Sequence, residues 1–493
     1  MSHNESDPET NSQSEEASRS RQTREYDIPF TSKIAFGVGH FFNDLSASMW
    51  FTYMMVYMQK VIKFRSSRAG LLMLVGQATD AVSTPLVGIL SDSDVLSGCF
   101  HRIGNRISWH MIGTLCVALS FPFIFNKCFI CHEESSEWIK FAWFVVPIVF
   151  FQFGWASVQI SHLALIPELT NIPSSRATLN SIRYAFSVIA NLTVFFVLAW
   201  FLSESTGHRS IGPWDQEHFE IAALLCVGLG TLTSIVFYAF TKEPKNVRRE
   251  RRSSSFSSNA SNFVRMHWTS WFGYIQFYQI ALLYMLCRLY VNISQVYFPF
   301  YITLTQNFDK KYVAIFPMIS YISSFLVSLV KSHPFVSKHV PKTGLLCMGL
   351  ITGMSACVSM LFELQDWRMY LVAMAIGITQ AVLLITSLSI TADFINKNTE
   401  SGAFVFGAMS FLDKLSNGLA YQIIELFNPT CDALKPHEAC KVFFRKIMVF
   451  VPGSCLLFSF VILITLMPQN IGDRSRQPIQ DNDEQPILEE EDE

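Results

Sequence analysis

Charged residues are scarce in this sequence: Asp, Glu, Lys and Arg make up 15% of its 493 residues, whereas a typical soluble protein carries about 25%. Half of the residues are hydrophobic, and phenylalanine alone occurs 44 times. Twelve membrane-spanning helices of about 20 residues would use roughly 240 apolar positions, close to the number present. The composition therefore argues against a soluble enzyme, a disordered scaffold or a disulfide-stapled secreted domain. A net charge of −2 also gives no reason to expect nucleic acid as a partner.

Two further features are missing. Residues 1–30 lack an apolar core, so we predict a disordered cytosolic tail there and not a cleaved signal peptide. No nucleophile–base pair, metal-binding motif or phosphate-binding loop stands out, so we expect neither an enzyme nor a bound metal or cofactor.

Apolar segments long enough to cross a bilayer occur at about 34–58, 69–91, 107–126, 138–165, 182–203, 219–241, 270–303, 312–332, 342–362, 367–392, 404–427 and 447–467. A polar, basic stretch separates the first six from the last six. We therefore predict an all-α membrane protein with twelve spans in two bundles. The expected units are a tail at 1–30, a bundle at 31–241, a basic cytosolic linker at 242–268, a second bundle at 269–468 and an acidic cytosolic tail at 469–493.

The distribution of Lys and Arg between the connecting segments predicts that both termini face the cytosol. The basic stretch at 242–268 contributes most to this prediction. The first outer loop is the main exception, because it holds four basic residues: Lys60, Lys63, Arg65 and Arg68.

Four of the 11 cysteines fall in predicted outer loops, which face an oxidising compartment: Cys128, Cys131, Cys431 and Cys440. A disulfide such as Cys431–Cys440 is plausible there. The spacing of Cys128 and Cys131 also occurs in redox and metal sites, but without a second pair or a nearby His cluster a structural bridge is favoured. The sequence leaves open which of the four are paired.

Ionised side chains at mid-depth in a bilayer cost on the order of 2.5–3.5 kcal/mol each, so each is expected to face a cavity or a partner. Such polar positions are His40, Asn43, Asp44, Asp80, Ser83, Thr84, Gln159, His162, Arg183, Arg288, Asn292, Asp413 and Lys414. His40 and Asp44 share a helix face that could bind or pass a proton. Asp80, Ser83 and Thr84 form one stripe that could hold Na⁺ or a proton. The alternative for each is a static packing pair or a residue near a helix end whose charged group extends to the membrane surface.

The connection between the second and third spans carries an acid and two bases: Asp92, Arg102 and Arg106. An acid at a helix end opposite basic residues across a short loop can act as a latch that holds two helices in one state. We predict a gating role for these residues, with ordinary inner-loop charge as the alternative.

Asp80-Ala-Val-Ser-Thr-Pro-Leu-Val-Gly-Ile-Leu-Ser-Asp92 and Arg106-Ile-Ser-Trp-His-Met-Ile-Gly-Thr114 resemble the signature of the glycoside–pentoside–hexuronide cation symporters. This resemblance implies the major facilitator fold, with two pseudo-symmetric six-helix bundles. It also implies a solute-binding role for Asp44 and a cation-site role for Asp80. Arg183 matches an arginine of the family's fifth span, and Lys414 matches a lysine of the eleventh span that is linked to cation and substrate.

Three departures from that family weaken its cation and sugar sites. Ser83 and Thr84 stand where the family has Asn and Asp, and Gln159 replaces a sugar-binding Asp. The family's fold is therefore expected here, but its sugar substrate does not carry over.

A narrower resemblance is to animal members of the superfamily that are associated with lysosomes and melanosomes. It is carried by Gly39-His-Phe-Phe-Asn-Asp-Leu-Ser-Ala-Ser-Met-Trp-Phe-Thr-Tyr53, Trp109-His-Met-Ile-Gly-Thr-Leu-Cys116 and Leu119-Ser-Phe-Pro-Phe-Ile-Phe125. It implies import of cysteine from the cytosol into the organelle lumen and an influence on pigmentation. The solute would then contact Asp44, Asn43, Gln159, Arg183 and Lys414. Proton or Na⁺ symport would be coupled through Asp80, Ser83, Thr84 and His40.

Two alternatives remain open: a cation-coupled symporter of a sugar or lysolipid, and a membrane scaffold or receptor that transports nothing. The tail offers a separate hint about location, since Asp483-Glu-Gln-Pro-Ile-Leu488 fits an acidic dileucine signal. A clathrin adaptor could bind Asp483, Ile487 and Leu488 there. This pattern favours the lysosomal and melanosomal membrane.

Overall fold

The computed structural model describes residues 27–92, 103–132, 134–204, 207–243, 268–332, 339–364, 366–395, 399–429, 438–469 and 471. Within these ranges the regular secondary structure is helical throughout, as the composition predicts. The predicted tails and basic linker lie almost entirely outside the described residues, as do Arg102, Cys431, Asp483, Ile487 and Leu488.

The helices follow the predicted spans in order. Those of the first half are α2 (Phe30–Val38), α3 (Phe41–Val56), the π-helical turn η1 (Tyr57–Val61), α4 (Ser66–Asp92), α6 (Asn105–Ile124), α7 (Glu137–Leu169), α8 (Pro173–Glu204), the 3₁₀ turn η2 (Pro213–Asp215) and α9 (Gln216–Phe240). Those of the second half are η3 (Trp268–Gly273), α11 (Ile275–Phe300), the π-helical turn η4 (Tyr301–Thr305), α12 (Tyr312–Ser332), α14 (Lys342–Ser359), α15 (Asp366–Ile395), α16 (Thr399–Leu426) and α17 (Glu438–Leu466).

Within the described ranges, ten helices are long and apolar enough to cross a bilayer. The other two predicted spans are the α2–α3 pair and α16. The first is interrupted at Gly39 and His40, where a Cβ on Gly39 would lie 2.5 Å from a ring carbon of Phe237. The second is made more polar by charged residues in its interior, Asp413 and Lys414. Both spans therefore depart from a plain apolar helix where they carry predicted site residues.

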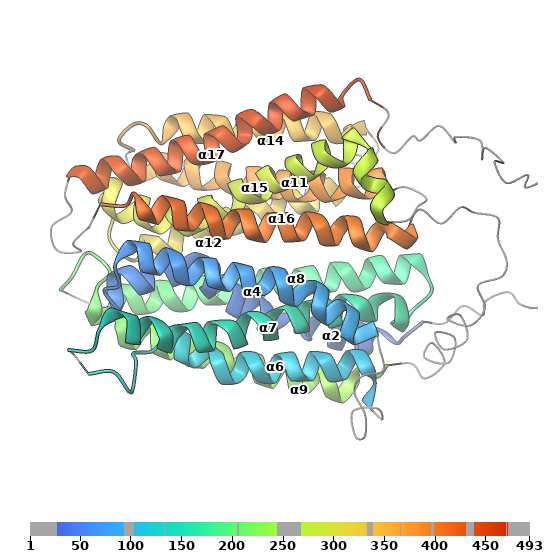
Figure 1. The fold of residues 1–493 in the computed structure, drawn as a ribbon, viewed down its shortest axis with the longest axis horizontal. Helices are drawn as coiled ribbons and strands as arrows, with labels where there is room; N and C mark the ends of the chain where they lie inside the picture. Colours follow the sequence, from blue (N-terminus) through green and yellow to red (C-terminus); the bar gives the residue numbers. More distant parts are fainter. Residues whose placement is uncertain are drawn as a thin grey trace, which may run out of the picture.

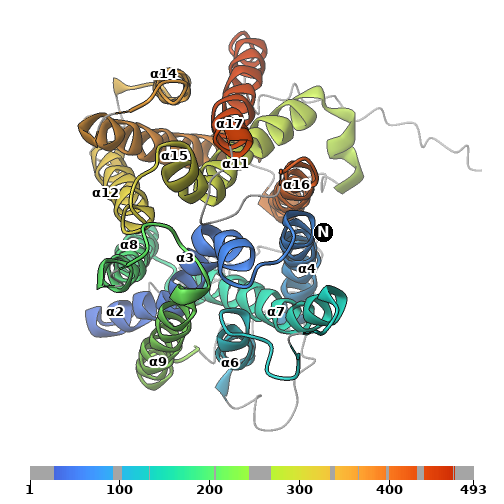
Figure 2. The same cartoon turned by 90° about the vertical axis from the view of Figure 1, so that its left-hand side faces the viewer.

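The helices run roughly along the long axis of the molecule (Figure 1). Seen end-on, α2 to α9 lie on one side and α11 to α17 on the other (Figure 2). The two halves meet mainly through α4 with α16, α8 with α12 and α3 with α11. We call the end that carries loops 57–65, 125–136, 207–215 and 306–311 the outer end and the opposite end the inner end, following the predicted orientation.

The first helix of each half ends in the same way, which supports a duplicated architecture. In η1, Ile62 N–H donates to Tyr57 O and Phe64 N–H donates to Met58 O. In η4, Gln306 and Phe308 repeat this pattern on Tyr301 and Ile302. Each turn then contains one non-glycine residue with positive φ, Lys63 at 65° and Asn307 at 56°.

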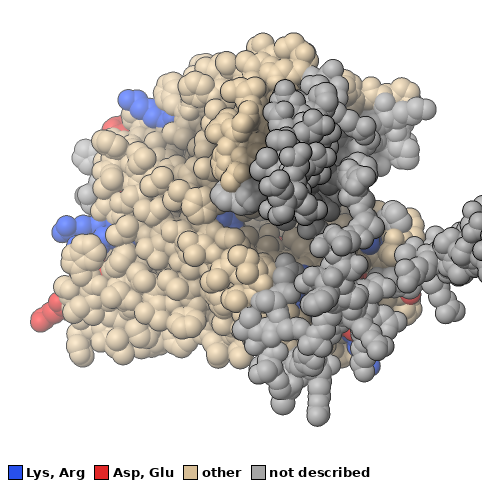
Figure 3. Space-filling model, turned by 45° about the vertical axis from the view of Figure 1, so that its right-hand side comes forward, with Lys and Arg blue, Asp and Glu red and all other residues tan. Residues whose placement is uncertain are grey.

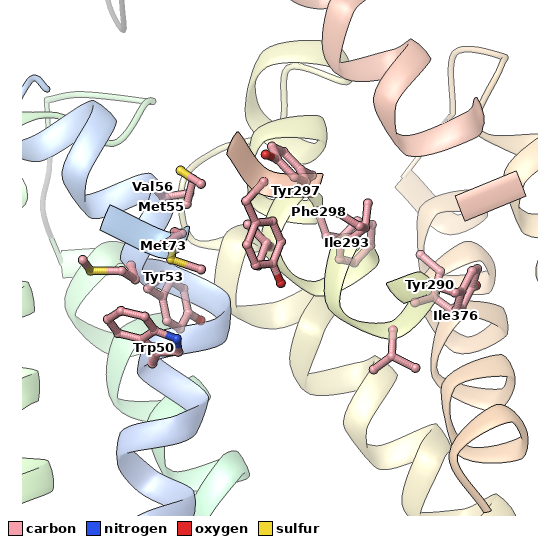
Figure 4. Packing of buried hydrophobic residues seen from close by; sticks show 14 of the residues in the cluster. Trp50, Tyr53, Met55, Val56, Met73, Tyr290, Ile293, Tyr297, Phe298 and Ile376 are labelled. Atoms are coloured by element: carbon pink, nitrogen blue, oxygen red, sulfur yellow. The ribbon is translucent and has the colours of Figure 1, made fainter. Parts of the chain in front are cut away.

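Apolar side chains form one large core cluster that continues from one half into the other. Figure 4 shows aromatic residues of both halves within it, with Trp50 and Tyr53 on α3 and Tyr290 and Tyr297 on α11. The sides of the helices that face away from the core are also apolar. On the face drawn in Figure 3, nearly all described atoms belong to uncharged residues. A large apolar surface of this kind is what a lipid environment requires.

The outer loop before α7 contains a disulfide between Cys128 and Cys131. The two cysteines are therefore paired with each other, which answers the pairing that the sequence left open for them. Cys440 is also disulfide-bonded, while Cys431, its predicted partner, lies outside the described residues.

Close packing of α4 against α16 depends on Gly70. A Cβ at this position would lie 2.8 Å from Glu425 Cβ and 2.9 Å from Gln422 Oε1. We expect Gly70→Ala to destabilise the protein by about 1–3 kcal/mol through overpacking, measured as a lower Tm of the purified full-length chain. Gly88→Ala is the matched control on the same helix, because no heavy atom lies within 4 Å of its new Cβ. Equal melting temperatures for the two variants would contradict this account.

Candidate functional site

A polar cluster surrounds Asp44 at the start of α3. The helix break at Gly39 places His40 one turn before Asp44, and the Nδ1–H of His40 donates to Asp44 Oδ2 over 2.8 Å. The hydroxyl of Ser187 on α8 donates to the same oxygen over 2.5 Å. Asp44 keeps 17% of its side chain exposed, so it is held in place without being sealed off.

Arg183 lies one turn before Ser187 on α8 and acts on Asp44 through a Coulombic attraction. Its Nε is buried and has no hydrogen-bond partner among the described residues. A buried donor without a partner is costly, typically 1–3 kcal/mol. The carboxylate and the guanidinium thus form neighbouring sites of opposite charge, and the guanidinium has an unused donor.

Two amides near this pair also have unused acceptors. The side-chain oxygens of Asn43 and Gln159 are buried and have no partner among the described residues. Asn43 Nδ2 lies 3.4 Å from His40 Nε2. Gln159 is on α7, one turn from Trp155 and one turn from His162, so it lies between the Asp44 cluster and the ion pair described next.

A second cluster joins the two halves. Lys414 Nζ of α16 donates to Asp80 Oδ1 of α4 over 2.6 Å and to Thr84 Oγ1 over 2.5 Å. Asp80 is only 2% exposed, and the ammonium lies 5.7 Å from the centre of the Trp155 ring. Thr84 donates to Asp80 Oδ1 over 3.1 Å, whereas Ser83 is buried one turn after Asp80 without a described contact to this pair. In this conformation the ammonium of Lys414 neutralises the carboxylate of Asp80.

The neighbouring acid, Asp413, is paired within the second half. Its carboxylate accepts from Arg288 Nε of α11 over 3.0 Å and from Asn417 Nδ2 over 2.7 Å. Two adjacent residues of α16 therefore pair with different halves of the molecule. Asp413 connects α16 to α11 in its own half, and Lys414 connects it to α4 in the first half.

At the inner end, Arg106 joins three helices of the first half. Its Nε donates to Glu168 of α7 over 3.2 Å and its Nη1 donates to Ser91 of α4 over 2.5 Å. The side chain of Asp92 and all of Arg102 lie outside what the structure describes. The predicted latch between Asp92 and the two arginines stays a prediction, and Glu168 is a partner that the sequence analysis missed.

Asp27 ties the start of α2 to α8 at the same end. Its carboxylate accepts from Lys33 Nζ and from Ser175 Oγ, each over 2.7 Å. The hydrogen bond from Lys33 lowers the pKa of Asp27 to about 2.

Sequence reasoning also missed a polar bridge between the halves at mid-depth. Gln295 Nε2 of α11 donates to Thr52 Oγ1 of α3 and to Tyr321 Oη of α12, both over 3.0 Å. Gln295, Thr52 and Tyr321 are uncharged, so they do not stand out as costly charges within an apolar span. Nothing in the sequence therefore marks them.

The outer end is held by three further contacts between the halves. Gln59 Nε2 of η1 donates to Glu425 Oε2 of α16 over 2.8 Å. Lys310 Nζ pairs with Asp215 Oδ1 over 2.6 Å, both almost fully buried. Arg209 and Asp309 form an exposed pair over 2.7 Å. We call this set the outer clamp.

The four basic residues of the first outer loop have different surroundings. Lys60 is 5% exposed and lies in η1, over the ring of Phe300. Arg65 and Arg68 pair with Glu137 at the start of α7. Lys63 is exposed.

Comparison with known proteins gives a consistent result. The family model described as MFS/sugar transport protein matches residues 35–473. The chain is 39% identical over 465 residues to "Major facilitator superfamily domain-containing protein 12" of Equus caballus, covering 92% of this chain and 96% of that protein. It is 38% identical over 456 residues to the Homo sapiens protein of the same name, covering 89% and 94%.

Solved structures agree on the fold. The crystal structure of the nucleoside transporter NupG superposes with a TM-score of 0.62 at 11% identity, over 88% of this chain and 99% of that one. The chain therefore belongs to the MFS/sugar transport protein family and is a multi-pass membrane transporter with the major facilitator fold.

Proposed function

We propose that this transporter imports cysteine from the cytosol into the lumen of lysosomes and melanosomes and thereby influences pigmentation. The observation that carries the proposal is the Coulombic attraction between Asp44 and Arg183, which offers a negative and a positive group in the same region. A zwitterionic amino acid presents an ammonium and a carboxylate on one carbon, and these match the two groups. The choice of cysteine rests on the motif resemblance at 39–53, 109–116 and 119–125, together with the similarity to the relatives above.

In the proposed bound state, the solute ammonium pairs with Asp44 and the solute carboxylate accepts from Arg183. The free amide oxygens of Asn43 and Gln159 accept from the ammonium. Lys414 borders the site and is released from Asp80 only when the halves move. Asp80, Ser83, Thr84 and His40 would couple this movement to a proton or Na⁺.

Transport would proceed by alternating access, in which the halves rock around the site. The outer clamp and the Gln295 bridge favour a state closed at the outer end. Release into the lumen then requires these contacts to break. The orientation with cytosolic termini, the surrounding membrane lipid and the adaptor signal at Asp483, Ile487 and Leu488 belong to the same proposal.

We expect Asp44→Asn to reduce uptake of radiolabelled cysteine into proteoliposomes at least about tenfold, because the loss of one charge-assisted pair costs about 1.5–3 kcal/mol. Ser46→Ala is the matched control on the same helix, since Ser46 donates only to the backbone oxygens of Phe42 and Asn43. Uptake by Asp44→Asn at the wild-type rate would remove Asp44 from the solute site.

The same preparation separates the alternatives. Na⁺-dependent uptake of a sugar or lysolipid that cysteine does not inhibit would favour the symporter of the first alternative. A purified protein that transports no solute would favour a scaffold or receptor. In that case, deletion of 242–268 and 469–493 from the chain in cells would abolish its cellular role.

A further inference from the structure

Three histidines from three helices meet in the first half, and two of them have no role in the function proposed above. His40 lies at the α2–α3 break, His110 on α6 and His162 on α7. Their exposed fractions are 5%, 0% and 0%. The centre of the His162 ring lies 5.4 Å from that of His40 and 5.7 Å from that of His110.

The hydrogen bonds define where protons reside on these rings. His162 Nε2 lies 2.8 Å from the carbonyl oxygen of Phe36, which can only accept, so Nε2 carries the hydrogen. Tyr238 donates its hydroxyl hydrogen to Thr114 over 2.8 Å. His110 Nδ1 lies 2.8 Å from the same hydroxyl. His40 uses its Nδ1–H on Asp44.

His162 Nδ1 is buried and has no hydrogen-bond partner among the described residues. With a neutral ring whose hydrogen is on Nε2, this nitrogen is a lone pair without a donor, an unfavourable arrangement in a buried site. The part of the chain that the structure describes holds no convergent set of three metal-binding side chains, which points away from a metal ion. A proton added at Nδ1 would convert this lone pair into an N–H donor.

Burial opposes a positive charge on His110 and His162, and the charged groups around the cluster strengthen or offset this effect. Asp44 on α3 contacts His40 over 2.8 Å. Arg183 on α8 acts on His162 through Coulombic repulsion and opposes a positive charge there. Tyr238 on α9 contacts His110 as a neutral hydroxyl. A solute carboxylate on Arg183 would offset this repulsion, so solute and proton would favour each other's binding.

We propose that His40, His110 and His162 form a proton-binding cluster that takes up one proton when a solute carboxylate binds Arg183. This inference rests on the proposed function. It assigns the coupling ion to the first half and leaves the Asp80–Lys414 pair to control the movement between the halves.

The test uses the purified full-length chain in proteoliposomes, with two assays. Exchange of radiolabelled for unlabelled cysteine at equal pH on both sides reports solute binding and movement. Uptake under a pH gradient of either sign, with a pH-sensitive dye inside the vesicles, reports proton movement. His162→Gln keeps an N–H for Phe36 but cannot take up a proton. His110→Asn is the second variant, in case the first does not fold.

For the wild type we expect faster uptake under a gradient of one sign, with a matching dye signal. In His162→Gln or His110→Asn, exchange stays within about twofold of the wild-type rate, and the stimulation falls at least about fivefold. Ser161→Ala on the same helix and His132→Gln in the outer loop are controls that retain the stimulation. Full stimulation in both cluster variants, or none in the wild type, would overturn the inference. Absence of exchange by the wild type would instead overturn the proposed function on which it rests.

Discussion

Replacing Lys414 with alanine is expected to destabilise the protein by about 3–5 kcal/mol and to abolish cysteine uptake. The physical reason is the burial of Asp80, which is 2% exposed and accepts from Lys414 over 2.6 Å. Removing one partner of a buried ion pair leaves an uncompensated charge. Thr84 alone cannot neutralise it. Unfolding of the purified protein, followed by melting temperature, measures the first effect, and proteoliposome uptake measures the second.

The double variant Lys414→Ala with Asp80→Asn separates stability from transport. Because it contains no buried unpaired charge, its melting temperature should recover most of the loss. Uptake should stay low, since the double variant lacks the charged contact that changes when the halves move. Wild-type uptake by the double variant would show that this pair serves only in packing.

Replacing Lys310 with methionine is expected to cost a similar amount, about 3–5 kcal/mol, because Asp215 is fully buried and pairs with it over 2.6 Å. The expected functional result is the opposite of that for Lys414. Lys310→Met with Asp215→Asn should recover both melting temperature and uptake. In the wild-type chain Gly212 N–H donates to Asp215 Oδ2 over 3.0 Å, and the asparagine oxygen can accept the same hydrogen bond. This pair holds the outer clamp and does not contact the proposed solute.

The exposed pair of Arg209 and Asp309 provides the matched control on the same loops. Arg209 keeps 80% of its side chain exposed, and exposed pairs contribute little to stability. Arg209→Ala should therefore leave the melting temperature unchanged. A double variant of Lys310 and Asp215 that folds but does not transport would assign this pair a direct part in the transport cycle.

Hydropathy predicted the helices well because each span must satisfy its own backbone in lipid. It located helix ends less well: α8 begins at Pro173 and α17 at Glu438, ahead of the predicted 182 and 447. The polar first turns of these helices continue beyond the apolar core and leave no hydropathy signal. The break at Gly39 was missed for a different reason, since it depends on the ring of Phe237 from a distant helix.

Candidate site residues were found by their cost in a bilayer, but their partners were not. The sequence analysis expected acids and bases of the two halves to neutralise each other. The structure pairs Asp80 with Lys414 across the halves, whereas Asp413 pairs with Arg288 inside one half. Spacing along a helix indicates which residues share a face, but it says nothing about which face of another helix lies opposite.

The amino-acid sequence by itself determined that this chain is an all-helical membrane protein of the major facilitator superfamily, because lipid imposes long apolar helices whose order can be read directly. Only the tertiary structure decided which polar groups meet. It brought together residues hundreds of positions apart, such as Gln59 with Glu425, and it buried Lys310 against Asp215. The physical reason is that a buried charge is tolerated only opposite its partner, and that opposition is a property of packed helices.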